Sequence, residues 1–301
     1  MELGRALLEL CQVVPDGVVV FFPSYAYLDG VVASWRKQTG SASLSLWQQI
    51  EARKKIFMEP KSSTSTSASS TNTSTTSTKG TNTSSSDKPG TNTTTTSKID
   101  ALLSAYTSHI HSSTSGSGTN GALLLAVING SLSEGINFSD RLGRCVVVVG
   151  LPFPNARGAE WQAKLEYVGA RAAAGVGASD SVGNAGHPEK AHTKKSDNPP
   201  SAAARESEAA KREFYTNACM RSVNQSVGRA IRHKGDWATI LLVDGRWERR
   251  EELRGKLPGW IGRSLEMVGD AGGGGGGGGK WRRMRSRLEG FFEGKKSSGG
   301  S

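Results

Sequence analysis

The sequence contains no long hydrophobic run. None of its uninterrupted apolar stretches, such as residues 18–22 and 145–149, approaches the length of about 20 residues that a membrane-spanning helix needs. The first ten residues also lack the basic segment, the apolar core and the cleavage site of a secretion signal. These absences predict a protein without a membrane partner.

Cysteine is scarce as well. The three cysteines, Cys11, Cys145 and Cys219, are far apart and form no CxxC pair, which favours reduced core thiols over a disulfide framework. The histidines have no cysteine or carboxylate set at metal-ligand spacing. We therefore expect no bound metal in this chain.

Hydrophobic residues are absent from whole segments. Residues 61–97 contain 26 Ser or Thr in 37 positions and no Leu, Ile, Val or aromatic residue. Residues 171–205 are mostly Ala, Gly, Ser and charged residues, and residues 272–279 are all Gly. The composition predicts disordered low-complexity insertions at about 61–97 and 171–205. A single domain then spans residues 1–260, and residues 261–301 form a Gly-rich linker and a basic tail.

The rest of the chain alternates short apolar runs with helical patterns, which predicts an α/β fold with a mostly parallel sheet flanked by helices. Strands are expected at residues 17–22, 56–58, 122–128, 145–149 and 237–243. Helices are expected at residues 3–14, 25–37, 99–111, 160–167 and 206–233. Ligand-binding loops are expected at the carboxyl ends of such strands.

The charge balance is strongly basic. The 38 Lys and Arg residues against 27 Asp and Glu give a net charge of +11, which favours a polyanionic partner such as nucleic acid. The segment KWRRMRSR after residue 279 concentrates this charge near the carboxyl end. It is consistent with a phosphate-binding tail, a nuclear address or a solvated amphipathic helix.

The block QSVGRAIR at residues 225–232 is the most informative. On a helix, Gln225, Arg229 and Arg232 fall within about 60° of one another. Two guanidinium groups beside an amide suit a phosphate clamp, and Gly228 leaves room for a ligand. The alternative is a solvated basic helix face.

Two further blocks follow predicted strands. The loop GSLSEGINFSD at residues 130–140 offers hydroxyl, carboxylate and amide groups from Ser133, Glu134 and Asn137, with Gly135 for close approach. It also suits an ordinary loop between a strand and a helix. The segment FFPSYAY at residues 21–27 predicts a helix capped by Ser24, and its alternative is simple capping with core aromatics.

In this order, the three blocks resemble motifs IV (FFPSY), V (SEGINFSD) and VI (QSVGRAIRH) of superfamily 2 helicases of the XPD-like, DEAH-type iron-sulfur group. The segments CQVVPDGVVVFFPSY, ARKKIFMEPK and VNQSVGRAIRHKGD are similar to the Chl-type branch, helicases associated with sister-chromatid cohesion. The resemblance covers residues 3–260 outside the insertions and implies a RecA-like helicase C-terminal motor domain.

The resemblance assigns roles to single residues. It implies that Arg229 and Arg232 are arginine fingers, with Gln225 near the γ-phosphate of ATP bound with Mg²⁺. The implied nucleotide-coupling residues are Glu134, Gly135, Asn137 and Gly228, and the implied DNA contacts are Ser24, Tyr25 and Ser133. Motif V often has a Lys where this sequence has Ser131, so one phosphate contact is not expected here.

Other parts of a complete helicase are missing. Residues 274–280 match GxxxxGK, but Trp281 follows where Ser or Thr would hold Mg²⁺. There is no DEAH segment, and three scattered cysteines cannot supply the family's four-cysteine 4Fe-4S site. We expect a helicase C-terminal half that shares ATP with a missing N-terminal helicase domain and is inactive alone.

For the whole protein, the resemblance implies 5′ to 3′ unwinding of single-stranded or forked DNA in DNA repair and cohesion. It also implies a nuclear location, with cohesion or replication factors as further partners. One alternative is a catalytically inactive nucleic-acid-binding or partner-docking module. A Rossmann-type enzyme is disfavoured because no GxGxxG follows the first strand.

Overall fold

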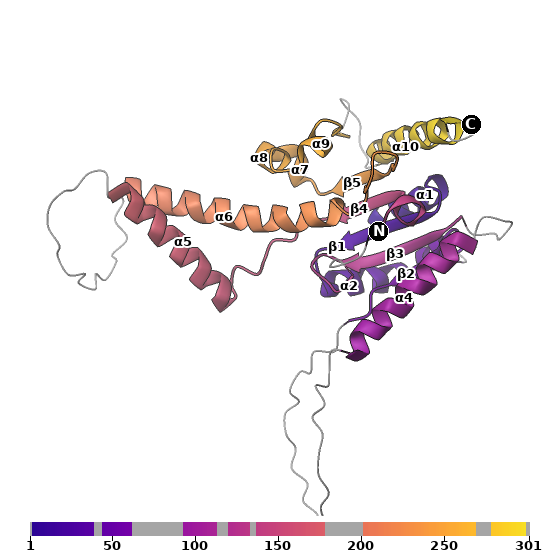
Figure 1. Cartoon of the computed structure of the whole chain (residues 1–301), viewed down its shortest axis with the longest axis horizontal. Helices are drawn as coiled ribbons and strands as arrows, with labels where there is room; N and C mark the ends of the chain where they lie inside the picture. Colours follow the sequence, from indigo (N-terminus) through magenta and orange to yellow (C-terminus); the bar gives the residue numbers. More distant parts are fainter. Residues whose placement is uncertain are drawn as a thin grey trace, which may run out of the picture.

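The computed structural model describes residues 2–38, 44–61, 93–112, 120–132, 137–177, 201–268 and 278–298. Its centre is a five-stranded sheet in the order β2–β3–β1–β4–β5, in which every neighbouring pair is parallel (Figure 1). The strands are β1 (Gly17–Phe22), β2 (Lys55–Met58), β3 (Ala122–Val127), β4 (Cys145–Val149) and β5 (Thr239–Val243). This arrangement confirms the predicted α/β class.

The three central strands are buried along their whole length. β1, β3 and β4 are runs of Val, Leu, Ala and Phe in which each residue is buried. Residues of this kind fit a strand covered on both faces, because alternate side chains then enter two apolar layers. β1 lies between the other two, with Val19 paired to Leu124 and Val146. Motif IV directly follows β1, and the loop of motif V follows its neighbour β3.

Helices from the second half of the chain cover most of one face. They are α6 (Ala202–Val227), α7 (Arg246–Arg249), α8 (Glu251–Arg254) and α9 (Gly259–Gly262), joined by α4 (Thr93–Ser112). Cys219, Met220, Val223 and Val227 of α6 pack in this layer against side chains of β1, β3 and β4. The end of the motif VI helix is thereby fixed on the sheet.

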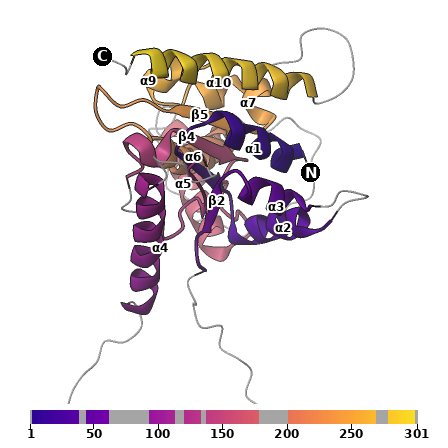
Figure 2. The same cartoon turned by 90° about the vertical axis from the view of Figure 1, so that its right-hand side faces the viewer.

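The opposite face is covered by helices from both ends of the chain. They are α1 (Glu2–Val13), α2 (Tyr25–Arg36), α3 (Leu46–Glu51) and α10 (Gly278–Ser298). Figure 2 shows α10 lying across the top of this layer, beside α1. Met284, Leu288 and Phe292 of α10 are buried there, so the basic segment forms an amphipathic helix that is part of the domain.

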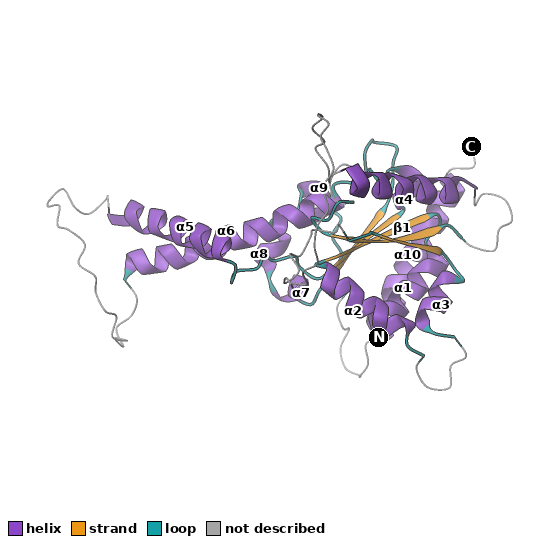
Figure 3. Ribbon diagram, turned by 90° about the horizontal axis from the view of Figure 1, so that it is seen from below, coloured by secondary structure: helices purple, strands orange, loops and turns teal. Residues whose placement is uncertain are grey.

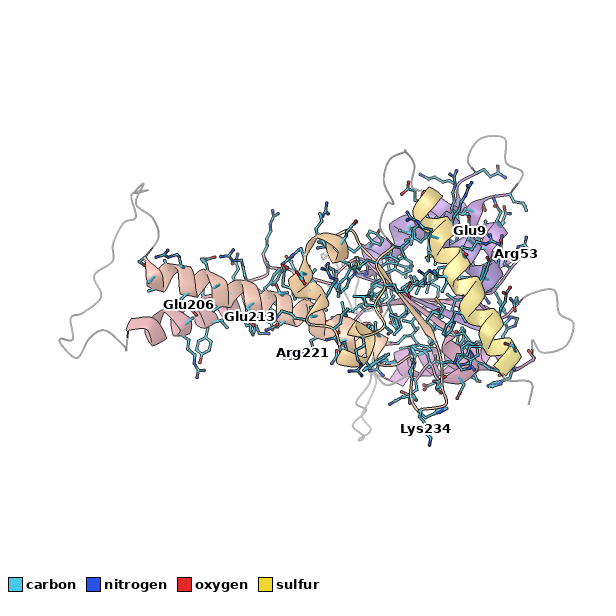
Figure 4. The ribbon with its side chains drawn as sticks, turned by 90° about the horizontal axis from the view of Figure 1, so that it is seen from above. Glu9, Arg53, Glu206, Glu213, Arg221 and Lys234 are labelled. Atoms are coloured by element: carbon cyan, nitrogen blue, oxygen red, sulfur yellow. The ribbon has the colours of Figure 1, made fainter. Side chains whose placement is uncertain are left out.

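The helices α5 (Ala159–Gly177) and α6 form a long hairpin that projects from the sheet (Figure 3). Trp161 packs against Phe214, with ring centroids 5.9 Å apart. Figure 4 shows Glu206 and Glu213 on the projecting part of α6 and Arg221 nearer the sheet. The predicted helix at residues 160–167 is thus only the first half of α5.

The predicted bounds of the two insertions need correction. Residues 93–97 belong to α4, residues 171–177 to α5 and residues 202–205 to α6; the remainder of both insertions, 62–92 and 178–200, lies outside the described residues. Among the helices that the structure describes, none combines the length and hydropathy needed to cross a bilayer.

Candidate functional site

The motif VI helix ends earlier than its sequence predicts. α6 stops at Val227, and the Gly228 N–H donates to the carbonyl oxygens of Asn224 and Ser226. The expectation that Arg229 and Arg232 share a helical face with Gln225 is therefore wrong, because both arginines lie in the loop after the helix. The Arg229 carbonyl, which would continue the helix, accepts instead from Phe138 N–H at 3.2 Å.

This bond connects motif V directly to motif VI. Another joins the Arg232 guanidinium to Asn137 Oδ1, with the guanidinium donating. His233 Nε2 of motif VI also lies 3.3 Å from Asp140 Oδ1 of motif V. Phe138 is buried and packs edge-on against Phe21 of β1, with ring centroids 6.1 Å apart. The Arg232 side chain is exposed and that of Arg229 is half-buried. The two motifs therefore form one surface although Asn137 and Arg232 are 95 positions apart in the sequence.

Gln225 lies apart from these contacts. It is exposed on the last turn of α6, where it lines a shallow hollow of about 560 Å³ with Asn217, Met220, Arg221, Asn224 and Lys256. The structure thus brings Asn137 and Arg232 into contact but places Gln225 on a neighbouring part of the surface. Gly228 is exposed, with φ −66°.

An ion-pair network holds the loops before β4 and β5 together. Arg144 Nη1 donates to Asp236 Oδ1 at 3.1 Å, both side chains are buried, and the guanidinium carbon lies 3.8 Å from the centroid of a Trp237 ring. His233 Nε2 lies 3.3 Å from Asp140 Oδ1. The end of motif V is therefore held both by His233 of motif VI and by Asp236, which follows it.

Asp140, His233 and Asp236 are close enough to be considered as metal ligands, since their ligand atoms lie within 4.8 Å of one another. Asp236 already accepts bonds from Arg144, from Asp140 N–H and from Trp237 N–H. A guanidinium in contact with the carboxylate disfavours a second cation there. We interpret the group as an ion-pair network.

The start of the motif V loop is held by a residue that the sequence analysis missed. Glu59, directly after β2, is 2% exposed. Its carboxylate accepts from Val127 N–H at 2.8 Å and from Leu132 N–H at 3.0 Å. It also accepts from the Tyr25 hydroxyl at 2.8 Å. Its position directly after a predicted strand is the signal that could have identified it.

The predicted DNA contacts of motif IV lie at the beginning of α2. Ser24 is exposed and its hydroxyl accepts from Tyr27 N–H at 3.1 Å, which confirms it as the N-cap. Tyr25 is half-buried, and burial together with its bond to Glu59 raises its pKa to about 12. The Tyr25 hydroxyl is therefore a neutral donor at physiological pH, engaged within the protein.

Three predicted site residues, Ser133, Glu134 and Gly135, lie outside the described residues. The flanking residues, however, are fixed. Leu132 is held by Glu59, and the Asn129 amide donates to Ser222 Oγ of α6 at 3.0 Å. Asn137 and Asp140 are held by Arg232 and by the network around Asp236. Both ends of the motif V loop are therefore anchored, each to a different part of the domain.

Comparison with known proteins identifies the family of this chain. The family described as "Helicase C-terminal domain" matches residues 7–75 and 64–264. ATP-dependent DNA helicase chl1 of Neurospora crassa is 40% identical over 288 residues, covering 86% of this chain and 23% of the relative. ATP-dependent DNA helicase DDX11 of Danio rerio is 36% identical over 261 residues, covering 86% and 22%.

Among solved structures, one titled XPD_APO aligns with a TM-score of 0.41 and 18% identity, covering 84% of this chain and 33% of that one. The chain spans about a quarter of the length of the curated relatives named above. The two curated relatives confirm the predicted resemblance to Chl-type helicases. The chain belongs to the helicase C-terminal domain family.

Proposed function

We propose that this chain is the motor half that completes the ATP site of an ATP-dependent DNA helicase and supplies part of its DNA track. The observation that supports this most is the direct contact of motif V with motif VI, through Asn137 with Arg232 and through Phe138 with Arg229. The Chl-type relatives are named ATP-dependent DNA helicases. Glu134, Gly135 and Gly228 are proposed to complete the nucleotide-coupling surface.

The residues present fit an ATP phosphate. Arg229 and Arg232 lie three positions apart in the loop after the helix. The Arg232 guanidinium is exposed, and its planar set of N–H donors matches the oxygens of a phosphate. Negative charge spreads over the γ-phosphoryl oxygens during hydrolysis, so an arginine placed there accelerates the reaction by about 10³ to 10⁵. ATP with Mg²⁺ would be held mainly by a second, N-terminal motor domain.

The DNA side of the proposal rests on the start of α2 and on charge. Exposed Ser24 lies at the amino terminus of α2, where backbone N–H groups favour a phosphate. The net charge of +11 adds a general attraction to a polyanion. Ser24, Tyr25 and Ser133 are proposed to contact a single strand of DNA.

Finer properties of the whole protein belong to the same proposal. They are 5′ to 3′ polarity on single-stranded or forked DNA, a nuclear location, and partners among cohesion or replication factors. A 4Fe-4S cluster, if the whole protein binds one, would belong to the N-terminal motor domain. Each follows from the resemblance to Chl-type helicases.

The test replaces the matching segment of the Neurospora crassa relative with this chain. Changing Arg229 to Ala in that chimera is expected to lower DNA-stimulated ATPase about 10³-fold, because a transition-state contact is lost. Affinity for a fluorescent single-stranded oligonucleotide should change less than about threefold. Arg205→Ala, an exposed arginine on the projecting part of α6, is the matched control.

The outcomes separate the alternatives. ATPase that survives Arg229→Ala would contradict the motor assignment. A chimera that binds DNA but has no ATPase even with Arg229 in place would favour a nucleic-acid-binding module that has lost catalysis. An equal loss of ATPase and DNA binding would show that Arg229 serves the DNA track instead. Strong ATPase from the 301-residue chain by itself would contradict the shared ATP site.

A further inference from the structure

Glu59 is a buried carboxylate, and among the described residues its hydrogen-bond partners are not cations. Its side chain is 2% exposed, and its own N–H extends β2 by donating to the Leu125 carbonyl at 2.9 Å. In the described part of the chain, its bonded partners are two backbone N–H groups and one phenolic hydroxyl. Burial of a charge is costly unless hydrogen bonds compensate it, and bonds to a carboxylate are stronger than neutral ones.

The three donors come from three parts of the candidate site. Tyr25 begins α2, next to the exposed Ser24. Val127 ends β3, and Leu132 belongs to the loop that enters motif V. One Glu59 oxygen, Oε1, receives both the Tyr25 hydroxyl and the Leu132 N–H. Movement of the Tyr25 hydroxyl therefore changes the hydrogen bonding of Oε1, the oxygen that also accepts from the Leu132 N–H at the start of the motif V loop.

The loop closes tightly over this carboxylate. A Cβ atom placed on Gly130 would lie 2.5 Å from Glu59 Oε1 and 2.9 Å from the Val127 carbonyl oxygen, so a side chain there would have to displace Glu59 or the backbone. Asn129, at the same turn, has φ 60°, a left-handed conformation that Asn adopts more readily than most residues. The turn at residues 129–132 is therefore shaped around the Glu59 side chain.

We propose that Glu59 is a positioning residue that couples the DNA contacts at the start of α2 to the motif V loop. DNA engaged by Ser24 and Tyr25 then acts through Glu59 on Leu132, and so on the residues that face ATP. This inference rests on the proposed function, since it assigns a route by which DNA controls hydrolysis.

The first measurement uses the 301-residue chain itself. In Glu59→Gln, an amide NH₂ replaces one carboxylate oxygen. It leaves the Val127 N–H without its acceptor if it replaces Oε2, and the Tyr25 hydroxyl and the Leu132 N–H without theirs if it replaces Oε1. Hydrogen exchange at the backbone amide that loses its acceptor, Val127 or Leu132, is expected to become about tenfold faster, the factor that about 1.4 kcal/mol represents. Glu51→Gln, an exposed glutamate at the end of α3, is the matched control and should leave Leu132 unchanged.

The second measurement follows ATPase in the chimera as single-stranded DNA is added. Glu59→Gln is expected to raise the DNA concentration for half-maximal stimulation about tenfold. The KM for ATP should change less than about twofold, because Glu59 is not expected to contact ATP. A general loss of folded protein would instead lower the maximal rate and leave both half-saturation points unchanged.

Tyr25→Phe keeps the inference testable if Glu59→Gln folds poorly, because it removes only one hydroxyl. It is expected to raise the half-maximal DNA concentration about threefold. The double variant should be no worse than Glu59→Gln alone, since residues that act through one contact are not additive. Tyr27→Phe, an exposed tyrosine on the same helix, is the control.

Arg229→Ala in the same chimera distinguishes two failures. If that change abolishes ATPase while Glu59→Gln and Tyr25→Phe leave the DNA dependence unchanged, the coupling role is wrong and the motor function stands. Additive effects of Glu59→Gln and Tyr25→Phe would also overturn the coupling role. If Arg229→Ala leaves ATPase intact, the proposed function fails and the inference fails with it.

Discussion

The two ends of β2 carry buried side chains of opposite charge, and each bonds to backbone groups of neighbouring loops and strands. Lys54, directly before the strand, is fully buried, and its ammonium donates to the carbonyls of Asp16 and Asn120 in the loops that precede β1 and β3. Glu59, directly after the strand, accepts N–H bonds from Val127 and Leu132 at the other edge of the sheet. Each charge gathers the backbone of neighbouring strands.

The difference between the two edges lies in what they hold. The carbonyls bonded to Lys54 belong to connections between elements of the domain, whereas Glu59 holds Tyr25 and the loop into motif V. Changes at the edge where strands begin should therefore alter stability, and changes at the edge where they end should also alter the response to DNA.

The largest stability effect is expected for Asp236→Ala, at the edge where β4 and β5 begin. Removal of the carboxylate leaves the buried Arg144 guanidinium without its counter-charge, which typically costs about 3–5 kcal/mol. Urea denaturation of the chain measures the loss. Glu252→Ala, which removes an exposed pair with Arg250, should give no measurable change. Equal losses in the two variants would show that the buried pair is not specifically required.

A smaller effect concerns the pH dependence of stability. Burial lowers the pKa of Lys54 from 10.5 to about 8, so the unfolded chain binds more protons above pH 8. Lys54 should therefore contribute a rise of about 1 kcal/mol to the free energy of unfolding between pH 8 and 9. The buried thiols oppose this over the same range, because burial raises the pKa of Cys11 to about 12 and that of Cys145 to about 11, and the unfolded chain loses those protons first.

Lys54→Met isolates this effect. Between pH 8 and 9 the stability of the variant should change by about 1 kcal/mol less favourably than that of the unaltered chain, because no group at position 54 then titrates. Denaturant midpoints of both chains at a series of pH values provide the measurement. The same pH dependence in both chains would show that Lys54 does not contribute.

The smallest effect compares two helix caps. Ser24→Ala and Ser45→Ala each remove an N-cap hydroxyl, from α2 and α3 respectively, and each should cost about 1 kcal/mol. Only Ser24→Ala is expected also to weaken binding of single-stranded DNA, by about twofold to threefold. Equal DNA affinity in both variants would remove Ser24 from the DNA track.

The sheet was predictable because its signal is local. β1 and β4 have the bounds expected from their apolar runs, since a strand buried on both faces needs such residues throughout. α5 was underestimated because the Ala-rich residues 171–177 look featureless by composition. Alanine is the strongest helix former, and packing against α6 completes the helix.

The site was less predictable because its geometry depends on distant contacts. The helical pattern continues to residue 233, but the Arg229 carbonyl bonds to Phe138 rather than to the next turn. The sequence around Arg229 gives no sign that Phe138 will bond to this carbonyl. Glu59 was missed for a similar reason, since a single carboxylate after a short strand acquires its role only when Tyr25 and Leu132 are brought to it.

The placement of α10 beside α1 has a consequence for biosynthesis. Arg285 of α10 lies 3.8 Å from Glu9 of α1, and the two helices share one apolar layer. A ribosome releases α1 well before it has made α10, and proteins begin to fold in that order. The sheet can form earlier, but this layer stays incomplete until α10 emerges, so the nascent chain exposes apolar surface on which a chaperone could act.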